Sequence, residues 1–250
     1  MTVVLHGYQY SVYVRIARMA LAEKGVAYER AEVNPFAPDV PTAYLAMHPF
    51  RRVPVLVHDD FTLYETGAIT RYVDETFPGP RLQPAAPRER ARMTQIISIV
   101  DSYGYWPMVR QVFAHSVFRP RVGEPADAAE IRKGLEGSAR ALGALEALAA
   151  DERFLVGSQL SLADLHLAPM IAYLSAAPEA RGMIADYPKL SAWWRCSGDR
   201  VSPRPIPGCR RGILPIDPPR LAPYGPATMT TARTRSFTAF YWTYRFPPAA

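Results

Sequence analysis

The sequence predicts an α/β N-terminal domain followed by an all-helical C-terminal domain. Three observations lead to this fold class. Residues 1–79 switch repeatedly between strand-like alternation and helical spacing, in the order β-α-β-α-β-β-α. After residue 87 the strand patterns stop, and Ala- and Leu-rich segments keep a helical spacing. The length of 250 residues fits one large domain or two small ones.

The N-terminal domain is expected to span residues 1–79. Its elements are strands at 2–8 and 26–33, two strands within 53–65 around an Asp59-Asp60 turn, and helices at 11–25, 42–47 and 65–77. A strand, a helix and a second strand predict a βαβ unit, and the closing strand pair predicts an antiparallel hairpin.

The Pro-rich segment 80–87 is expected to link this domain to a helical domain at 88–195. Apolar residues at helical spacing predict its helices at 88–115, 127–150, 161–176 and 188–194. Ser161 followed by Asp164 is a capping-box pattern, which predicts the start of the third of these helices.

The charge of the chain is concentrated in residues 196–250. The whole chain has 29 Lys+Arg and 23 Asp+Glu, but residues 1–195 hold 21 of each. The remaining 8 Arg and 2 Asp share their segment with 10 of the 25 prolines, so we expect an irregular tail. A disordered tail and a shifted reading frame after Trp194 both fit this composition. The balanced body gives no reason to expect nucleic-acid binding.

The small number of cysteines and the lack of long apolar runs exclude several classes of protein. Both cysteines, Cys196 and Cys209, lie in the tail, too few for a disulfide framework or a four-cysteine metal site. No run approaches the ~20 apolar residues needed to span a bilayer, and the first residues lack the pattern of a secretory signal. We therefore expect a cytoplasmic protein with no membrane partner and no metal.

Ser11 lies where the first strand gives way to the first helix. Serine is a preferred N-cap residue, so a structural role alone accounts for it. The same position also suits an anion, because helix starts carry unpaired N–H groups and a partial positive charge. A thiolate is such an anion, and hydroxyl donation would help a thiol ionise near neutral pH.

Two further motifs fit a peptide-like ligand. The Val53-Pro54 bond precedes a buried strand, and a cis bond there would turn the Val53 N–H and C=O outward for strand-like pairing. Glu65 and Thr66 open a helix, where they either complement its dipole or clamp an amino acid. In the second case Glu65 takes an ammonium group and the helix start takes a carboxylate.

Over residues 1–195 these motifs, in this order, resemble the glutathione S-transferase superfamily, and within it bacterial-type members of the serine-dependent theta, phi and delta branches. The matching segments are SVYVRIARMALAEKG (11–25), NPFA (34–37), HPFRRVPVL (48–56), LYETGAITRYVDETF (63–77), FLVGSQLSLADLHLAP (154–169) and YPKLSAWW (187–194). The resemblance implies a thioredoxin-like N-terminal domain with a glutathione site, a helical domain with a hydrophobic co-substrate pocket, and a homodimer.

The same resemblance assigns roles to individual residues. Ser11 matches the catalytic serine, with Tyr8 as the alternative. Val53 and the cis Pro54 would bind the cysteinyl backbone of glutathione, Glu65 and Thr66 its γ-glutamyl group, and Arg52 replaces a commoner Gln. The expected co-substrate pocket consists of aromatic and apolar side chains, namely Tyr10, Tyr13, Tyr103, Trp106, Val109 and Phe113.

The hypothesis from sequence is a glutathione transferase with a role in detoxification. It joins the thiolate of its co-substrate glutathione to a small hydrophobic electrophile. A glutathione-dependent isomerase or dehalogenase would use the same site. A non-catalytic binding protein of the same fold is a further alternative, motivated by the tail and by the Arg51-Arg52 pair.

Overall fold

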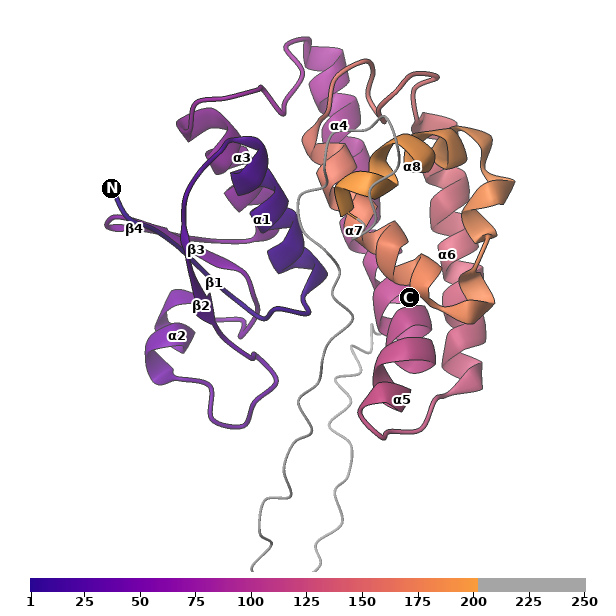
Figure 1. Cartoon of the computed structure of the whole chain (residues 1–250), viewed down its shortest axis with the longest axis horizontal. Helices are drawn as coiled ribbons and strands as arrows, with labels where there is room; N and C mark the ends of the chain where they lie inside the picture. The colour runs from indigo at the N-terminus through magenta and orange to yellow at the C-terminus, as the bar shows by residue number, and fades with distance from the viewer. Residues whose placement is uncertain (202–250) are drawn as a thin grey trace, which may run out of the picture. The chain divides into compact units, whose positions relative to one another are not determined.

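A small mixed sheet forms the N-terminal part of the chain. The computed structural model describes the backbone of residues 1–201 and the side chains of residues 1–196 (Figure 1). Its strands are β1 (Val3–Gly7), β2 (Glu29–Glu32), β3 (Val55–His58) and β4 (Phe61–Tyr64), in the spatial order β2-β1-β3-β4. β1 runs parallel to β2, and β3 is antiparallel to both β1 and β4. The expected βαβ unit and hairpin are confirmed.

The register of the sheet brings three chain segments to one end. His6 on β1 pairs with Val55 on β3, and Val55 pairs with Tyr64 on β4. The carboxyl ends of β1 and β4 therefore meet the amino end of β3. The residues that follow β1, precede β3 and follow β4 all leave the sheet at that edge.

Helices α1 (Val12–Glu23) and α3 (Thr66–Thr76) pack against each other, and α1 also contacts a helix of the C-terminal half (Figure 1). α1 is buried on most sides, which its apolar composition predicts. It approaches β1 so closely that a Cβ on Gly7 would lie 2.4 Å from Val14 Cγ2. The short helix α2 (Thr42–Met47) contacts β4.

The C-terminal half is helical, as expected, and all described residues belong to one compact unit. Its elements are α4 (Pro87–Ile99), η1 (Val100–Gly104), η2 (Trp106–Phe118), α5 (Arg119–Arg121), α6 (Ala128–Leu148), α7 (Leu162–Ala176), η3 (Pro178–Ala180), η4 (Met183–Asp186) and α8 (Pro188–Val201). α7 is buried at nearly every position and contacts α1, α4, η2 and α8, so it forms the centre of this half.

Two parts of the helical half differ from the expectation. The segment 88–115 was expected as one regular helix, but η1 and η2 are wound as π-helix. Apolar spacing does not distinguish this winding from the α form, and Pro107 has no N–H to donate to a preceding turn. α8 continues to Val201, into the segment expected to be irregular. The rest of that expected irregular tail, 202–250, lies outside the described residues.

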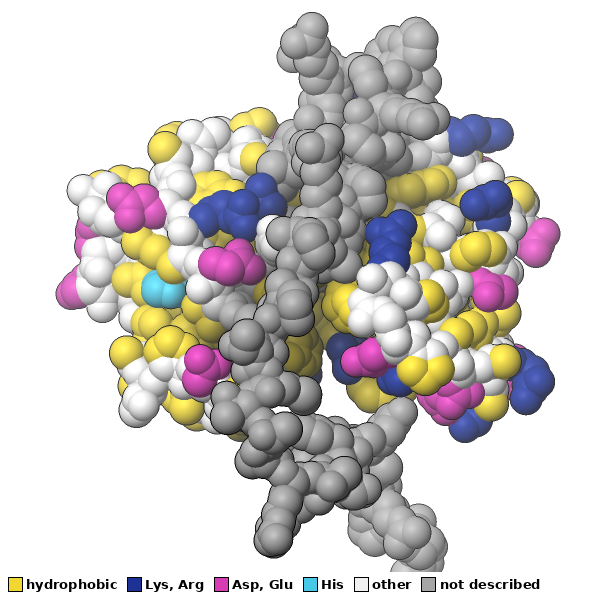
Figure 2. All heavy atoms as spheres, turned by 60° about the horizontal axis from the view of Figure 1, so that its bottom comes forward, with side chains coloured by type: hydrophobic (Ala, Val, Ile, Leu, Met, Phe, Trp, Pro, Cys, Tyr) yellow, Lys and Arg dark blue, Asp and Glu magenta, His cyan; other side chains and the backbone are white. Residues whose placement is uncertain are grey.

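The described residues on the face shown in Figure 2 carry charges of both signs. On the face in Figure 2, Lys and Arg side chains alternate with Asp and Glu side chains among apolar surface. This agrees with the balanced charge of residues 1–195. Within residues 1–201 no helix is both long and apolar enough to cross a membrane.

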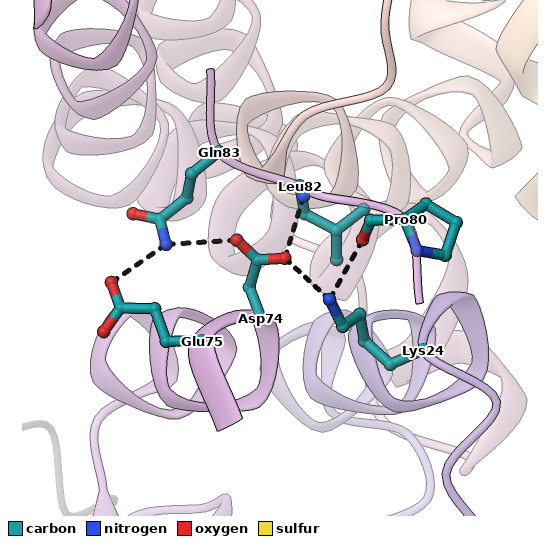
Figure 3. Close-up of polar contacts among 6 residues, drawn as sticks. All are labelled: Lys24, Asp74, Glu75, Pro80, Leu82 and Gln83. Carbon is teal, nitrogen blue, oxygen red and sulfur yellow. Dashed lines mark hydrogen bonds and ion pairs between the residues drawn. The ribbon is translucent and has the colours of Figure 1, made fainter. Parts of the chain in front are cut away.

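A buried ion pair fixes the segment that joins the two halves (Figure 3). Lys24 Nζ lies 3.1 Å from Asp74 Oδ1 and 3.0 Å from the Pro80 carbonyl oxygen. Asp74 also accepts hydrogen bonds from the Leu82 N–H at 2.8 Å and from Gln83 Nε2 at 3.1 Å. One carboxylate thus connects the ends of α1 and α3 to the linker.

Candidate active site

Ser11 is the N-cap of α1. Its backbone is extended, its N–H donates to the Tyr8 carbonyl at 2.9 Å, and its hydroxyl oxygen accepts a bond from the Val14 N–H at 3.4 Å. Because that contact uses only a lone pair, the hydroxyl hydrogen can still be donated to a ligand. The cap and the anion-binding role are therefore compatible in one side chain.

Tyr8, the alternative to Ser11, lies just beyond the end of β1. Its ring meets the edges of Tyr10 and Phe36, with centroid separations of 5.2 Å and 6.2 Å. Tyr8 and Ser11 are joined through the backbone bond above. Which of the two activates a thiol stays a prediction.

The Val53-Pro54 peptide bond is cis, as the sequence suggested. Among the described residues, the Val53 N–H and C=O form no backbone hydrogen bond. The preceding carbonyl, that of Arg52, accepts a bond from the Tyr44 hydroxyl at 2.5 Å. The Val53 amide group is therefore available to a strand-like ligand.

Arg51 is in the left-handed region, with φ 51°, and holds the loop between β2 and α2. Its guanidinium donates to the carbonyls of Pro35 and Ala37. The side chain of Arg52 is exposed, and its charge adds to burial, the larger cause, in lowering the pKa of His48. Both members of the unusual Arg51-Arg52 pair are thus exposed, and the guanidinium of Arg51 has a structural role.

Glu65 and Thr66 form the turn into α3. Glu65 has φ 71°, a strained conformation for a residue with a Cβ, and its side chain is exposed and makes no capping bond. Such strain costs about 1–3 kcal/mol and persists mainly at functional sites. Thr66 is the buried first residue of the helix. An exposed carboxylate therefore lies beside a helix start.

The sheet brings these three motifs together. Ser11 follows β1, Val53 precedes β3 and Glu65 follows β4, and the register places these three strand ends at one edge. Two helix starts, the unpaired N–H and C=O of Val53 and one carboxylate thus share that edge. This set can bind a molecule that carries an ammonium group, a carboxylate and an extended backbone.

The residues expected to line a co-substrate pocket fall into two groups. Tyr103 and Trp106 are exposed, at 67% and 54%, and Tyr10 is half-buried. The others pack toward the core. Val109 is 9% exposed, the Phe113 ring lies 4.3 Å from the Tyr173 ring, and the Tyr13 ring lies 4.9 Å from the Tyr105 ring.

A group of polar side chains around a buried histidine was not anticipated from the sequence. His166 on α7 is fully buried, with Nε2 3.4 Å from Thr70 Oγ1 and Nδ1 3.6 Å from Asp101 Oδ1. Thr70 in turn donates to the Gly67 carbonyl at 3.3 Å, in the first turn of α3. Burial first, and then the Asp101 carboxylate, raise the pKa of Tyr13. The only sequence signal is a lone histidine in the apolar run of α7.

Three histidines with lowered pKa values predict that the stability of the fold depends on pH. Burial lowers the pKa of His48, with a smaller effect from Arg52, and burial is also the main cause that lowers the pKa of His6 and His115. The unfolded chain then binds protons more readily than the folded chain below the usual pKa of about 6.5. Stability is therefore complete above that pH and falls as the pH drops toward the lowered values.

We expect the urea midpoint to fall between pH 7 and pH 5, and His48→Gln to make this fall smaller. Each histidine contributes at most about 1.4 kcal/mol per pH unit. His115→Gln should also make the fall smaller, because burial lowers the pKa of this histidine on η2 as well. A slope that is the same in wild type and both variants would contradict the assignment.

Within the described part of the chain, no three His, Cys, Asp or Glu side chains gather to form a metal site. The fold joins a small mixed sheet to a helical C-terminal half, and three sequence motifs meet at one edge of that sheet. Two family models match this chain, the glutathione S-transferase N-terminal domain at residues 5–81 and its C-terminal domain at 105–197.

Individual proteins agree with these family models. The chain is 34% identical over 191 residues to glutathione S-transferase F10 of Arabidopsis thaliana, covering 75% of this chain and 86% of that protein. The structure of glutathione S-transferase III in its apo form is similar with a TM-score of 0.70 at 29% identity, over 83% of this chain and all of that one.

A second similar structure holds a glutathione derivative. It is glutathione S-transferase I bound with lactoylglutathione, similar with a TM-score of 0.67 at 26% identity, over 78% of this chain and 93% of that one. The chain belongs to the glutathione S-transferase family.

Proposed function

We propose that this protein is a glutathione transferase that joins the glutathione sulfur to a small hydrophobic electrophile. One observation supports this most directly: Ser11, Val53 and Glu65-Thr66 leave the sheet at one edge. The Ser11 hydroxyl donates to the sulfur and stabilises the thiolate. The thiolate then attacks an electrophilic carbon, and the electron pair departs with the leaving group.

The remaining motifs hold the glutathione backbone. Val53 pairs with the cysteinyl residue of glutathione beside the cis Pro54. The exposed side chain of Arg52 also contacts glutathione. Glu65 takes the α-ammonium of the γ-glutamyl group, and the start of α3 at Thr66 takes its carboxylate. Calorimetric titration of glutathione into the full chain tests this part, with Glu65→Gln expected to weaken binding.

Ser11→Ala is expected to raise the pKa of bound glutathione and to slow turnover. A hydrogen bond to a charged group contributes about 1.5–3 kcal/mol, which corresponds to about 1–2 pKa units and a 10- to 100-fold loss near pH 7. The pKa is read from the ultraviolet absorbance of the thiolate in the complex. Turnover is read with an activated aryl halide.

Two variants serve as controls. Ser11→Thr keeps both the cap and the hydroxyl, so it should retain the wild-type pKa of the thiol within a few tenths of a unit. Tyr8→Phe tests the alternative residue. If Ser11→Ala leaves the pKa of the thiol and turnover unchanged while Tyr8→Phe changes both, the role belongs to Tyr8. If neither variant changes them, neither hydroxyl activates the thiol.

We also propose that the protein is a cytoplasmic homodimer. The support for this is the family membership and, for the location, the absence of a membrane-spanning helix among the described residues. Sedimentation of the full chain distinguishes a dimer from a monomer.

A further inference from the structure

Arg110 on η2 lies between two aromatic rings from different parts of the fold. Its guanidinium carbon is 5.7 Å from the Phe36 ring centroid and 6.0 Å from the Trp106 ring centroid. Phe36 comes from the loop between β2 and α2, and Trp106 begins η2. Both distances are within the range of cation–π attraction, so the two rings hold the charge in place.

The guanidinium has no anionic partner within the described residues. None of the ion pairs or side-chain hydrogen bonds found there involves Arg110. The N–H groups of Arg110 are therefore available to bind a ligand, since contact with the face of an aromatic ring does not use them in strong hydrogen bonds. The rings beside it are themselves exposed, Phe36 at 65% and Trp106 at 54%. A fixed cation thus borders an exposed aromatic surface.

This surface is connected to the residue proposed to activate the thiol. Ser11 donates through its N–H to the Tyr8 carbonyl at 2.9 Å, and the Tyr8 ring lies 6.2 Å from the Phe36 ring. The path from Ser11 to Arg110 therefore passes through two aromatic side chains in direct contact. An aromatic co-substrate bound along these rings would have its reacting carbon toward Ser11 and its opposite end toward Arg110.

We propose that Arg110 is a specificity-determining residue that selects aromatic electrophiles bearing a carboxylate. This rests on the proposed transferase function. The planar guanidinium suits a carboxylate because it can donate two parallel hydrogen bonds. The exposed Trp106 ring offers the aromatic body of the substrate a stacking partner. A neutral substrate of the same shape gains only the stacking.

The test uses two electrophiles of nearly the same shape but different charge, 4-chloro-3,5-dinitrobenzoate and its neutral carboxamide. In each reaction the glutathione sulfur bonds to the ring carbon and the carbon–chlorine bond breaks. Chloride leaves with the electron pair, and the thiol proton passes to the solvent. The readout is the ratio of kcat/KM for the carboxylate to kcat/KM for the carboxamide.

Arg110→Gln is expected to lower this ratio about tenfold, as loss of a charge-assisted bidentate contact does. Arg110→Lys should lower it less, because an ammonium keeps the charge without the planar donor pair. The matched control is Arg153→Gln, which also removes an exposed arginine from an aromatic ring, 5.3 Å from the Phe154 centroid. That variant should keep the wild-type ratio.

Binding separates this proposal from the transferase function. The affinities of the two glutathione conjugates, carboxylate and carboxamide, are measured by calorimetry on the full chain. If neither electrophile reacts but the affinity ratio falls in Arg110→Gln, the transferase proposal fails, whereas recognition of the carboxylate by Arg110 stands. If the carboxamide reacts and both ratios are unchanged in Arg110→Gln, the role of Arg110 fails and the transferase proposal stands. If neither conjugate binds, both are overturned.

Discussion

Asp74→Ala is expected to lower the free energy of unfolding by about 3–5 kcal/mol, because removing one member of a buried ion pair leaves the other charge without its partner. The side chains of Lys24 and Asp74 are only 2% and 5% exposed. The variant also leaves the Leu82 N–H without its acceptor at 2.8 Å. Urea unfolding of the full chain, followed by circular dichroism, measures the change.

The matched control is the exposed pair between Arg119 and Glu124, at 3.5 Å with exposures of 29% and 58%. Solvent screens such a pair, so Glu124→Ala should cost no more than about 1 kcal/mol. Equal losses in the two variants would show that burial of the Lys24–Asp74 pair has no energetic consequence. A loss below about 1 kcal/mol in Asp74→Ala would show the same.

The Lys24–Asp74 pair is also expected to affect glutathione binding, because of where it lies on α1 and α3. Lys24 is the C-cap of α1, and Asp74 lies in the last turns of α3. The opposite ends of these helices carry Ser11 and Thr66. We therefore expect Asp74→Ala to weaken glutathione binding through the relative placement of the two helix starts, even under conditions where the variant remains folded.

The local signals in the sequence were sufficient for most of the fold. Alternation and helical spacing predicted all four strands, and Ser11 and Asp164 lie at the helix starts that their chemistry indicated. The pairing of β1 with β3 was not predicted, since it joins strands about fifty residues apart and no local pattern encodes it. That pairing is also what brings the ends of β1 and β3 together at the site.

The residues of the co-substrate pocket were harder to predict from the sequence, because their contacts join segments that are distant along the chain. Aromatic residues on η2 looked equivalent in sequence, yet Trp106 is exposed whereas Phe113 packs on Tyr173. The difference depends on the π-helical winding, which apolar spacing does not reveal. The contact between Arg110 and Phe36 spans the two halves of the fold and has no local signature.

Asp164→Asn is expected to be as destabilising as the loss of Asp74, at about 3–5 kcal/mol. Asp164 is 1% exposed and accepts four hydrogen bonds. Oδ1 accepts from the Leu155 N–H at 2.9 Å and from Trp193 Nε1 at 2.8 Å. Oδ2 accepts from the Ser161 N–H at 2.8 Å and the Ser161 hydroxyl at 2.7 Å.

Asparagine keeps the shape but replaces one acceptor oxygen by a donor, so two buried donors lose their partner and face another N–H group. The control is Asp127→Asn at the exposed N-cap of α6. There the carboxylate accepts from the Ala129 and Glu130 N–H groups, and solvent can replace it. The loss of stability in Asp127→Asn should therefore be much smaller.

Asp164 joins the start of α7 to α8 through Trp193. α7 also carries Tyr173, which donates to the Tyr10 carbonyl at 3.0 Å, beside Ser11. Urea unfolding followed by tryptophan fluorescence should therefore show an earlier midpoint for Asp164→Asn than for Asp127→Asn, and coinciding midpoints would contradict the role of Asp164 as the buried acceptor on which α7 depends.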